Sequence, residues 1–466
     1  MQQADDIVVI SDLHVSAARG QGLFRADAEL AGFLAWLHRE VRPCTLFLNG
    51  DVLDFLVLGD GEDASDASDF TKAAARAKKM IENHEEVFGA LSLLAKSPEH
   101  EVVILAGNHD PELVLTEVQR AVEAALGHLT GSPGKAAVTW LAHGLAARAS
   151  VGAAKVVIEH GDIYDAWNMV DHETLRRELM LLSRGIDPRH RKLPLRLLGL
   201  DIRYTPPPGT EFVGLLREVR RKFPWVDLLK PEAAVLALIY ANINFNPLSD
   251  RGRQTRLLDL IRQYGRMNAR SVVNEARRLI SPRALYRAPH GGADGSGFER
   301  WLQSVEQKPT RGFIREWSIS TQIDLLVPYL RQTSIADSFF DPDLPDDGAR
   351  AAAFLVAQGG DVIVNGHTHA AKAYVPPGGK GLYLNSGTWG RLMKLPPGEA
   401  GPEVWSQLIG DLNAGKEQSF SRPTFIRVRA EGGRTVASLC EWRDGTSATL
   451  SYWSFVPDSR EWLKEK

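Results

Sequence analysis

Five short segments along the chain are mainly apolar, and each is followed directly by polar side chains. They cover residues 7–10, 45–48, 102–105, 155–159 and 361–364. Apolar runs of this length that end in turn residues are typical of buried β-strands. Because ligands collect at the carboxyl ends of strands in open α/β sheets, the pattern predicts a shared site built from these polar groups.

Helical patterns separate the first strands. Residues 25–40 carry an apolar stripe from Leu30 to Leu37, and residues 70–95 also have the pattern of a helix, whereas residues 59–69 indicate a surface loop. Strands that alternate with helices predict an α/β architecture with parallel pairing.

The C-terminal part has a different pattern. Residues 425–429, 435–442 and 448–455 read as short strands separated by glycine turns. Strands joined by such short turns are typical of antiparallel pairing. We therefore expect an antiparallel edge that completes a sheet.

Composition narrows the class of protein. The chain has 466 residues, 44% of them apolar and 24% charged, which is typical of a globular protein of two or three domains. Two cysteines without Cys-x-x-Cys spacing argue against a disulfide framework or a thiolate metal site. The first residues do not resemble a secretory signal, and the longest apolar run, residues 233–241, is too short for a membrane span. We expect a cytoplasmic protein.

The polar groups after the strands are carboxylates, an amide and imidazoles. They are Asp12, His14, Asp51, Asn108, His160, His367 and His369. Nitrogen and oxygen ligands without thiolate suit Mn, Fe or Zn ions. Seven groups are too many for one tetrahedral ion but suit two adjacent ions, with Asp51 well placed to bridge them. Two ions about 3.5–4 Å apart can clamp a phosphoryl group, so the set predicts hydrolysis of a phosphate ester.

Each pair of residues also has an ordinary interpretation as a loop or a turn. The prediction rests on five strand ends presenting the set together, since single motifs are often false positives. Three further carboxylates, Asp54, Asp162 and Asp165, could hold ligand imidazoles in the right tautomer. A capping or turn role is an equal alternative for these three.

The ordered blocks resemble the calcineurin-like metallophosphoesterases. The blocks are Asp12-x-His14, Gly50-Asp51, Gly107-Asn108-His109-Asp110, His160-Gly161-Asp162 and Gly366-His367-Thr368-His369. The resemblance covers about residues 5–170 and 355–460. It implies a four-layer αββα sandwich of two mixed sheets flanked by helices.

The resemblance also implies a role for each residue. Asp12, His14 and His369 would bind one ion, and Asn108, His160 and His367 would bind the second, with Asp51 as the bridge. His109 would donate a proton to the leaving oxygen or contact the phosphate, and Asp110 would orient His109.

The blocks also discriminate among branches of the family. Residues 50–56 lack the Arg of the protein serine/threonine phosphatases, so that branch is disfavoured. The blocks at residues 160–165 and 385–389 are more similar to the branch that contains UDP-2,3-diacylglucosamine pyrophosphatase. His109 stands where that enzyme has Arg, and this chain is about twice as long. The resemblance therefore extends to the branch and not to the substrate.

The additional length is mainly one insertion. We predict a core in two parts, residues 1–170 and 347–466, and a helical lid or cap at residues 171–346. The helical patterns within the insertion cover residues 172–182, 211–223, 232–243, 255–264, 267–280 and 321–331. A helix at residues 348–358 is assigned to the core.

Charge is distributed unevenly. The net charge is only −3, but residues 171–300 hold 24 Lys and Arg against 14 Asp and Glu, and the rest of the chain is acidic. This asymmetry predicts an anionic partner.

Residues 184–203 interleave arginine with leucine, which suits a lid over a lipid-linked phosphate or contact with an anionic membrane surface at the inner membrane face. A solvated face on a helix packed against the core is an equal alternative. Nucleic acid is less favoured because aromatics are not interleaved with the basic residues.

These observations predict an enzyme. We expect hydrolysis of a phosphodiester or pyrophosphate bond by a hydroxide that bridges two divalent ions, Mn²⁺ foremost and Fe or Zn as alternatives, with His109 assisting the leaving group. The alternatives are a nuclease whose basic insertion grips the backbone, a phosphomonoesterase, and an inactive metal-binding scaffold.

Overall fold

The computed structural model describes the core of the chain. The described residues are 2–3, 5–18, 22–57, 59, 72–127, 138–165, 168–183, 339–346, 348–376, 379–397, 400–416 and 419–465. Most of the predicted insertion lies outside these residues, including its helical patterns from residue 211 to residue 331 and the arginine-leucine stretch at 184–203.

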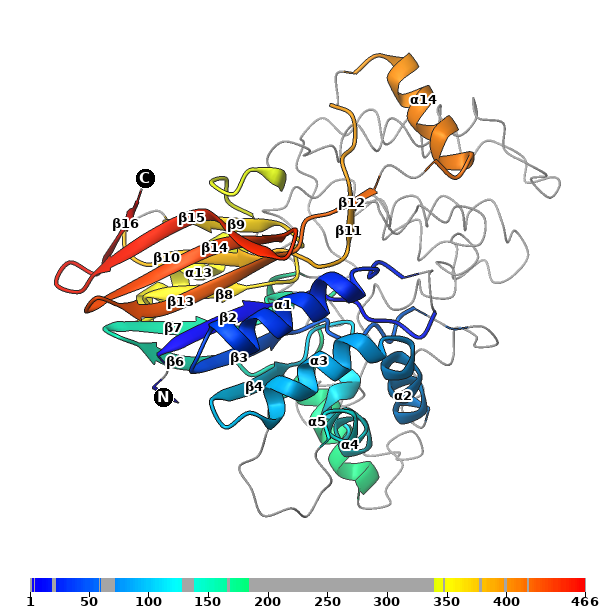
Figure 1. Ribbon diagram of the computed structural model, residues 1–466, viewed down its shortest axis with the longest axis horizontal. Helices are drawn as coiled ribbons and strands as arrows, with labels where there is room; N and C mark the ends of the chain where they lie inside the picture. Colours follow the sequence, from blue (N-terminus) through cyan, green and yellow to red (C-terminus); the bar gives the residue numbers. More distant parts are fainter. Residues whose placement is uncertain are drawn as a thin grey trace, which may run out of the picture.

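Two mixed β-sheets form the centre of the molecule (Figure 1). The larger sheet has the order β16 (Glu461–Lys464), β15 (Thr446–Val456), β14 (Arg434–Arg443), β13 (Thr424–Glu431), β2 (Asp6–Ile10), β3 (Cys44–Asn49), β4 (His100–Leu105), β5 (Val138–Leu141). The smaller sheet has the order β1 (Gln2–Gln3), β6 (Ala147–Val151), β7 (Ala154–Ile158), β8 (Val362–Asn365), β10 (Leu382–Ser386), β9 (Ala371–Tyr374). A separate two-stranded ribbon pairs β11 (Arg391–Met393) with β12 (Ser419–Ser421).

The strand directions confirm the predicted architecture. Strands β2, β3, β4 and β5 pair in parallel, as do β7 and β8. Strands β13, β14 and β15 form the predicted antiparallel edge, and β13 attaches it to β2. Strand β16, which was not predicted, extends this edge by pairing with β15. Because β7 and β8 are adjacent, the chain leaves the smaller sheet after residue 158 and returns to it at residue 362.

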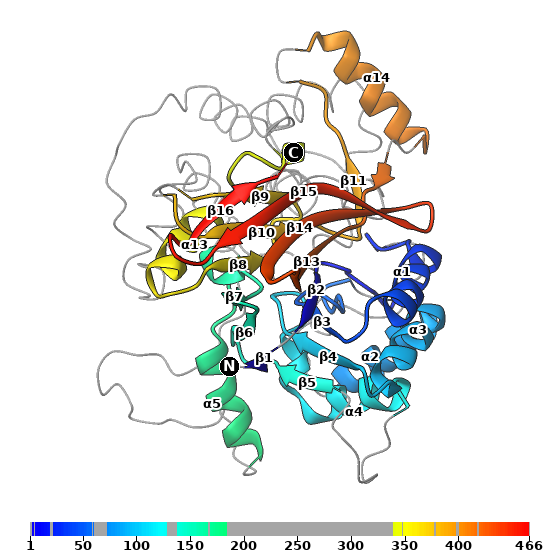
Figure 2. The same ribbon diagram turned by 60° about the vertical axis from the view of Figure 1, so that its left-hand side comes forward.

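Helices complete the layers. They are α1 (Asp27–Glu40), α2 (Ala73–Asn83), α3 (Glu85–Lys96), α4 (Thr116–Ala125), α5 (His172–Ser183), α13 (Gly348–Ala357) and α14 (Pro402–Asn413), with short 3₁₀ turns η2 (Pro111–Val114) and η3 (Asp162–Tyr164). Helices α1 to α4 gather on one side of the larger sheet (Figure 2). Helix α13 packs on the outer face of the smaller sheet.

Alternation along the strands explains this layering. In β2, Val8 and Ile10 pack against the helices, whereas Ile7 and Val9 face the smaller sheet. Successive side chains of a strand point to opposite faces, so a strand that is apolar at every position is buried on both faces. Val157 of β7 likewise packs with the α13 layer, whereas its neighbours face the space between the sheets. The order helices, sheet, sheet, helix is the predicted four-layer α/β sandwich.

One predicted helix is divided in two. The expected helix at residues 70–95 ends at Asn83, and a new helix begins at Glu85. His84 between them has a φ of −127°, outside the helical range, and its Nδ1 lies 2.7 Å from the Asp27 carboxylate. His84 is buried. The tertiary contact with α1 therefore overrides the local periodicity.

Several elements were not predicted. Strands β5, β6, β9 and β10 and helices α4 and α14 had no assignment from the sequence. These strands are short, and β6 and β9 contain alanine, lysine or arginine, so their apolar pattern is weak. Helix α5 and helix α13 confirm the patterns at residues 172–182 and 348–358.

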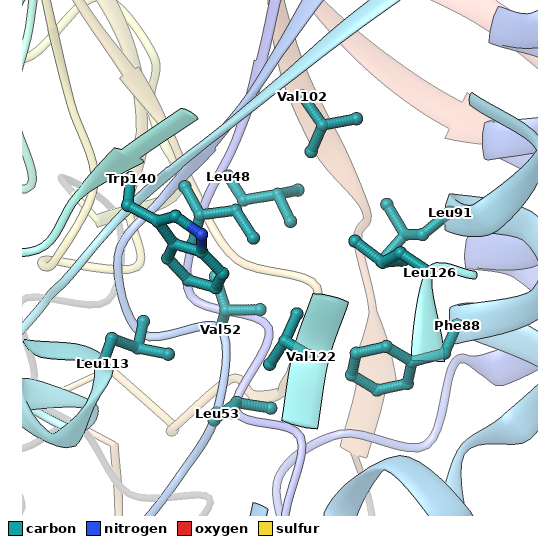
Figure 3. Close-up of a pocket in the computed structure, with 11 residues that line it drawn as sticks. Leu48, Val52, Leu53, Phe88, Leu91, Val102, Leu113, Val122, Leu126 and Trp140 are labelled. Carbon is teal, nitrogen blue, oxygen red and sulfur yellow. The ribbon is translucent and has the colours of Figure 1, made fainter. Parts of the chain in front are cut away.

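A small apolar cavity lies between the larger sheet and the helices (Figure 3). Leu48, Val52, Val102 and Trp140 are among its lining residues, together with Leu53 from the segment that follows β3. Leu53 is 1% exposed. This packing supports the backbone just beyond Asp51.

We expect Leu53→Ala to lower the free energy of unfolding by about 2–5 kcal/mol, because the lost side chain would enlarge a cavity that is already present. Chemical denaturation followed by circular dichroism measures the change. Leu463→Ala is the matched control, since Leu463 is 53% exposed and should change stability by no more than about 0.5 kcal/mol. Similar losses for both variants would contradict the packing argument.

No helix in the described part of the chain has both the length and the apolar character needed to cross a bilayer.

Candidate metal centre

The predicted ligands converge where strands of both sheets end. Asp12 and His14 follow β2, Asp51 follows β3, and His160 follows β7. The two sheets are joined at this point, since the Asn49 side chain donates to the Glu159 carbonyl at 2.9 Å. The site is therefore held by strand ends that are far apart in the sequence.

The His and Asp side chains form three overlapping groups. Each group offers one ligand atom per residue within 4.8 Å of the others, and the groups are Asp12/His14/His369, His14/Asp51/His109 and Asp51/His160/His367. The Oδ2 atom of Asp51 lies 3.8 Å from Nε2 of His14 and 3.4 Å from Nε2 of His160. Asp51 therefore belongs to two of the groups and stands between them.

Asn108 joins the group around His160. Its Oδ1 atom lies 2.9 Å from Nδ1 of His367 and 3.3 Å from Nε2 of His160. On the other side of Asp51, Oδ1 of Asp12 lies 3.4 Å from Nε2 of His369. All seven predicted ligand residues are thus brought together.

The histidine rings are oriented by their outer nitrogens. Nδ1 of His14 contacts Asp54 at 3.1 Å, and Nδ1 of His160 contacts the Asn49 carbonyl at 2.8 Å. Nε2 of His367 contacts Asp165 at 3.1 Å. A hydrogen bond to one ring nitrogen places the proton there and leaves the lone pair of the other nitrogen directed inward.

Two inward nitrogens lie unusually close together. Nε2 of His14 and Nε2 of His369 are 3.0 Å apart. With Nδ1 of His14 bonded to Asp54, a neutral His14 presents a lone pair to His369. Lone pairs from several imidazoles that share a small space with carboxylate and amide oxygens are the donor set of a borderline divalent cation. The residues present therefore fit divalent metal.

Several of the predicted ligand residues have a backbone with positive φ. In the described part of the chain, seven residues other than glycine have positive φ, and five of them are predicted ligands with φ between 52° and 68°. The five are Asp12, His14, Asp51, His367 and His369. This region is disfavoured for residues with a Cβ atom, and such strain persists only where the surrounding structure enforces it.

Two glycines of the blocks are required by space. A Cβ atom at Gly107 would lie 2.7 Å from Nε2 of His160 and would also meet the Asp51 carboxylate. A Cβ atom at Gly366 would lie 2.6 Å from Oδ2 of Asp12. Glycine at these positions allows the backbone to approach the ligand side chains.

Charge in the site favours an ionised Asp51. Burial alone would raise the pKa of this carboxyl, but the imidazoles of His160 and His109 hold the pKa well below its usual range. For His109, burial lowers the pKa, but Asp54 and Asp51 outweigh it and raise the pKa to about 9. The two carboxylates therefore favour the protonated form of His109, which could give its proton to a leaving group.

The prediction that Asp110 orients His109 is wrong. Nδ1 of His109 contacts Oδ1 of Asp54 at 3.0 Å. Asp110 instead accepts from the backbone N–H groups of Gly107 at 2.6 Å and Val52 at 2.8 Å. Asp110 thus braces the two ligand loops against each other, and Asp54 holds the imidazole.

The structure distinguishes the two roles considered for Asp54, Asp162 and Asp165, which are to orient an imidazole or to stabilise a turn. Asp54 and Asp165 each contact an imidazole of the site, as described above. Asp162 accepts from the backbone N–H of Val170 at 3.2 Å, which is a turn role. Their spacing along the sequence could not distinguish these cases.

The sequence assigned no role in the site to Ser11, Ser386 or Thr388. The Ser11 hydroxyl contacts the Asp12 carboxylate and lies 2.6 Å from the Ser386 hydroxyl. The Thr388 hydroxyl donates to the Asp12 carbonyl at 2.7 Å. Ser386 and Thr388 belong to the block at residues 385–389, whose polar side chains after an apolar strand were the available signal.

Glu112 is a buried carboxyl directly beyond this centre. It is 4% exposed, and its Oε2 atom has no hydrogen-bond partner among the described residues. Burial raises the pKa of Glu112 to about 8, and Arg76 opposes the shift only in part. The folded protein thus holds a proton here that the unfolded chain releases near pH 4.5.

The stability contributed by this proton is complete below about pH 4.5 and is lost as the pH rises through about 8. We expect Glu112→Gln to lack this decline, because glutamine has no carboxyl to ionise. Between pH 5 and pH 8, the unfolding free energy of the wild type should therefore fall by about 2–4 kcal/mol relative to that of the variant. Urea unfolding at both pH values measures it. Exposed Glu403→Gln is the control, and parallel pH profiles for Glu112→Gln and wild type would refute the prediction.

Part of the chain is similar to a known protein family. Residues 6–213 match the family model described as calcineurin-like phosphoesterase. No curated protein matches the chain significantly. Part of the chain is similar to a solved structure titled "Structure of Vacuolar Protein Sorting 29 from Cryptosporidium Parvum", with 22% identity, a TM-score of 0.15, and coverage of 24% of this chain and 45% of that chain.

The similarity to that structure spans less than half of its length. The pyrophosphatase-like branch stays a prediction, since these comparisons do not confirm it. The family match covers β2 through α5, and the structure adds His367 and His369 to the same centre. The match, the two-sheet fold and the clustered His and Asp residues show a similarity to the calcineurin-like phosphoesterases over residues 6–213, which is less than half of the chain.

Proposed function

We propose that the chain is a binuclear-metal-dependent phosphoesterase that hydrolyses a phosphodiester or pyrophosphate bond. The observation that carries the proposal is the place of Asp51, whose Oδ2 atom lies within 3.8 Å of imidazole nitrogens from both ligand groups. A buried, ionised carboxylate between two sets of nitrogen donors suits a ligand shared by two cations.

The groups divide between two ions. Asp12, His14 and His369 would hold one ion, Asn108, His160 and His367 the other, and Asp51 would be shared. When bound, two such ions polarise the phosphoryl oxygens and lower the pKa of a coordinated water to about 7. Mn²⁺ is our first expectation for this nitrogen and oxygen set.

His109 supplies the proton for the leaving oxygen. Its side chain is 28% exposed, more than that of Asp54 at 2%, so His109 can reach a substrate while Asp54 stays beneath it. Asp54 contacts Nδ1 of His109 and Nδ1 of His14, which fixes both rings. Nε2 of His109 is then the nitrogen that faces the leaving group.

The anionic character of the substrate is supported by the sequence. The excess of basic residues between 171 and 300 provides positive charge in the segment between β7 and β8. We propose that this segment forms a lid over a lipid-linked, phosphate-containing substrate, with an anionic membrane surface as an additional contact. Liposome sedimentation with and without anionic lipid tests that contact, and protein that stays in the supernatant throughout argues against it.

Metal content and activity test the function together. Purified protein is analysed for Mn, Fe and Zn and is then assayed with added Mn²⁺ on bis(p-nitrophenyl) phosphate, a nucleoside-sugar pyrophosphate and p-nitrophenyl phosphate. We expect two ions per chain and faster turnover of the diester or pyrophosphate than of the monoester. Two bound ions without hydrolysis of any substrate would favour an inactive scaffold, and a preference for the monoester would favour a phosphomonoesterase.

A nuclease is the second candidate because of the same basic excess. Binding to single- and double-stranded DNA and RNA at two salt concentrations tests it. Phosphate contacts release counterions, so a nuclease should bind at low salt and weaken steeply as salt increases. No binding at low salt would remove this candidate.

A further inference from the structure

The turn that carries two predicted ligands is held in a strained conformation. His367 and His369 both have left-handed backbones, with φ of 68° and 60°. Thr368 lies between them, and its backbone N–H donates to the Gly366 carbonyl at 2.8 Å. Two strained residues on either side of one ordinary residue need outside contacts to keep their geometry.

Those contacts meet at the Thr368 hydroxyl. It donates to Oδ2 of Asp346 at 2.8 Å and accepts from Nδ2 of Asn385 at 3.0 Å. Asn385 also donates to the Gly366 carbonyl at 2.7 Å and is fully buried at the end of β10. The turn is thus bonded to the neighbouring strand on one side and to Asp346 on the other.

Asp346 belongs to the segment that returns to the core. It stands shortly before α13, in the stretch that leads from outside the described residues back to β8. This stretch is itself anchored, because the buried Lys372 ammonium donates to the Asp341 carbonyl at 2.7 Å and the Phe339 carbonyl at 3.2 Å. At the opposite flank, Asp165 contacts His367. Both flanks of the segment therefore touch the same turn.

We propose that Asp346 is a positioning residue for the ligands His367 and His369, acting through the hydroxyl of Thr368. The proposal rests on the proposed function, since it assumes that these histidines bind metal. It also implies that the segment between β7 and β8 is coupled to metal binding, because its final residues carry one of the bonds that set the ligand turn. Asp346 itself contributes no ligand atom.

Mn²⁺ affinity, measured by isothermal titration calorimetry of the full chain after chelation, tests the proposal without an activity assay. Loss of a residue that orients a metal ligand typically weakens binding by about 10–100-fold, and we expect Asp346→Ala to weaken Mn²⁺ binding by about 10-fold or more. Thr368→Val should also weaken binding, and the double variant should lose clearly less than the sum of the two single losses, because both variants remove the bond between Thr368 and Asp346. Asp346→Asn keeps an oxygen acceptor and should recover most of the affinity.

Asp343→Ala is the matched control. Asp343 lies in the same flank with the same charge, but it pairs with Lys464 at 2.7 Å, at the surface. Circular dichroism of each metal-free variant shows whether it is folded. Wild-type affinity in Asp346→Ala, an equal loss in Asp343→Ala, or additive losses in the double variant would each overturn the proposal. Wild-type protein that binds no Mn²⁺ would overturn the proposed function itself, which is a distinct result.

Discussion

Asp51→Asn is expected to lose bound metal and to retain less than about a thousandth of the wild-type hydrolysis rate. Loss of a single electrostatic contact in an active site already costs about 10²–10³-fold, and here the lost charge is the one shared by both proposed ions. Asn keeps the shape of the side chain and one oxygen, so it can still accept the His109 backbone N–H that now donates to Oδ1 at 2.8 Å. The variant should therefore fold.

Metal analysis of the purified variant and turnover of bis(p-nitrophenyl) phosphate with added Mn²⁺ measure both effects. Asp444→Asn is the matched control, because Asp444 also has a positive φ, 51°, but lies in the exposed turn between β14 and β15. The control should keep full activity. An Asp51→Asn protein with two ions and near-normal turnover would show that Asp51 is no bridge.

His109→Ala should keep its metal but slow the hydrolysis of substrates with poor leaving groups by about 10²–10⁴-fold. The reason is that a poor leaving group needs a proton as the bond breaks, whereas p-nitrophenolate leaves without one. Asp54 and Asp51 raise the pKa of His109 and so favour the protonated form that a proton donor needs.

The measurement is a comparison of kcat on esters whose leaving groups differ in pKa. For the variant, the logarithm of kcat should fall more steeply as leaving-group pKa increases than it does for the wild type. His143→Ala, at an exposed position outside the centre, serves as control. An equal loss on good and poor leaving groups would assign His109 to phosphate binding and not to proton donation.

The structure shows that Asp54, and not the predicted Asp110, contacts the His109 ring. Asp110 is the immediate neighbour of His109 in the sequence, yet its side chain turns away to accept backbone N–H groups, whereas Asp54 reaches the ring from the loop after β3. His109 and Asp110 lie in the loop after β4, where the fold of the backbone decides the direction of each side chain, so proximity in sequence is a poor guide to which side chains touch.

The local sequence also could not predict the break at His84 or the role of Asp346, because both depend on contacts with residues that are distant along the chain. The periodicity of residues 70–95 contains no signal for the break, because the contact made there by His84 is with Asp27 on another helix. Asp346 lies 22 residues from Thr368, in a stretch without a motif, and only the return of the chain to β8 brings the two together. Contacts of this kind depend on how elements pack and not on local pattern.

The sequence by itself determined the five strands that end at the site, their parallel order at the start of the chain, and the seven predicted ligand residues that cluster there. It could do so because a buried strand is a local apolar pattern, and because ligand chemistry is a property of residue type at strand ends. Only the tertiary structure decided how the rings are oriented, which carboxylates hold them, and how both flanks of the segment between β7 and β8 meet the turn at Thr368. Those features are bonds between residues far apart along the chain, and such bonds exist only once two sheets are packed face to face.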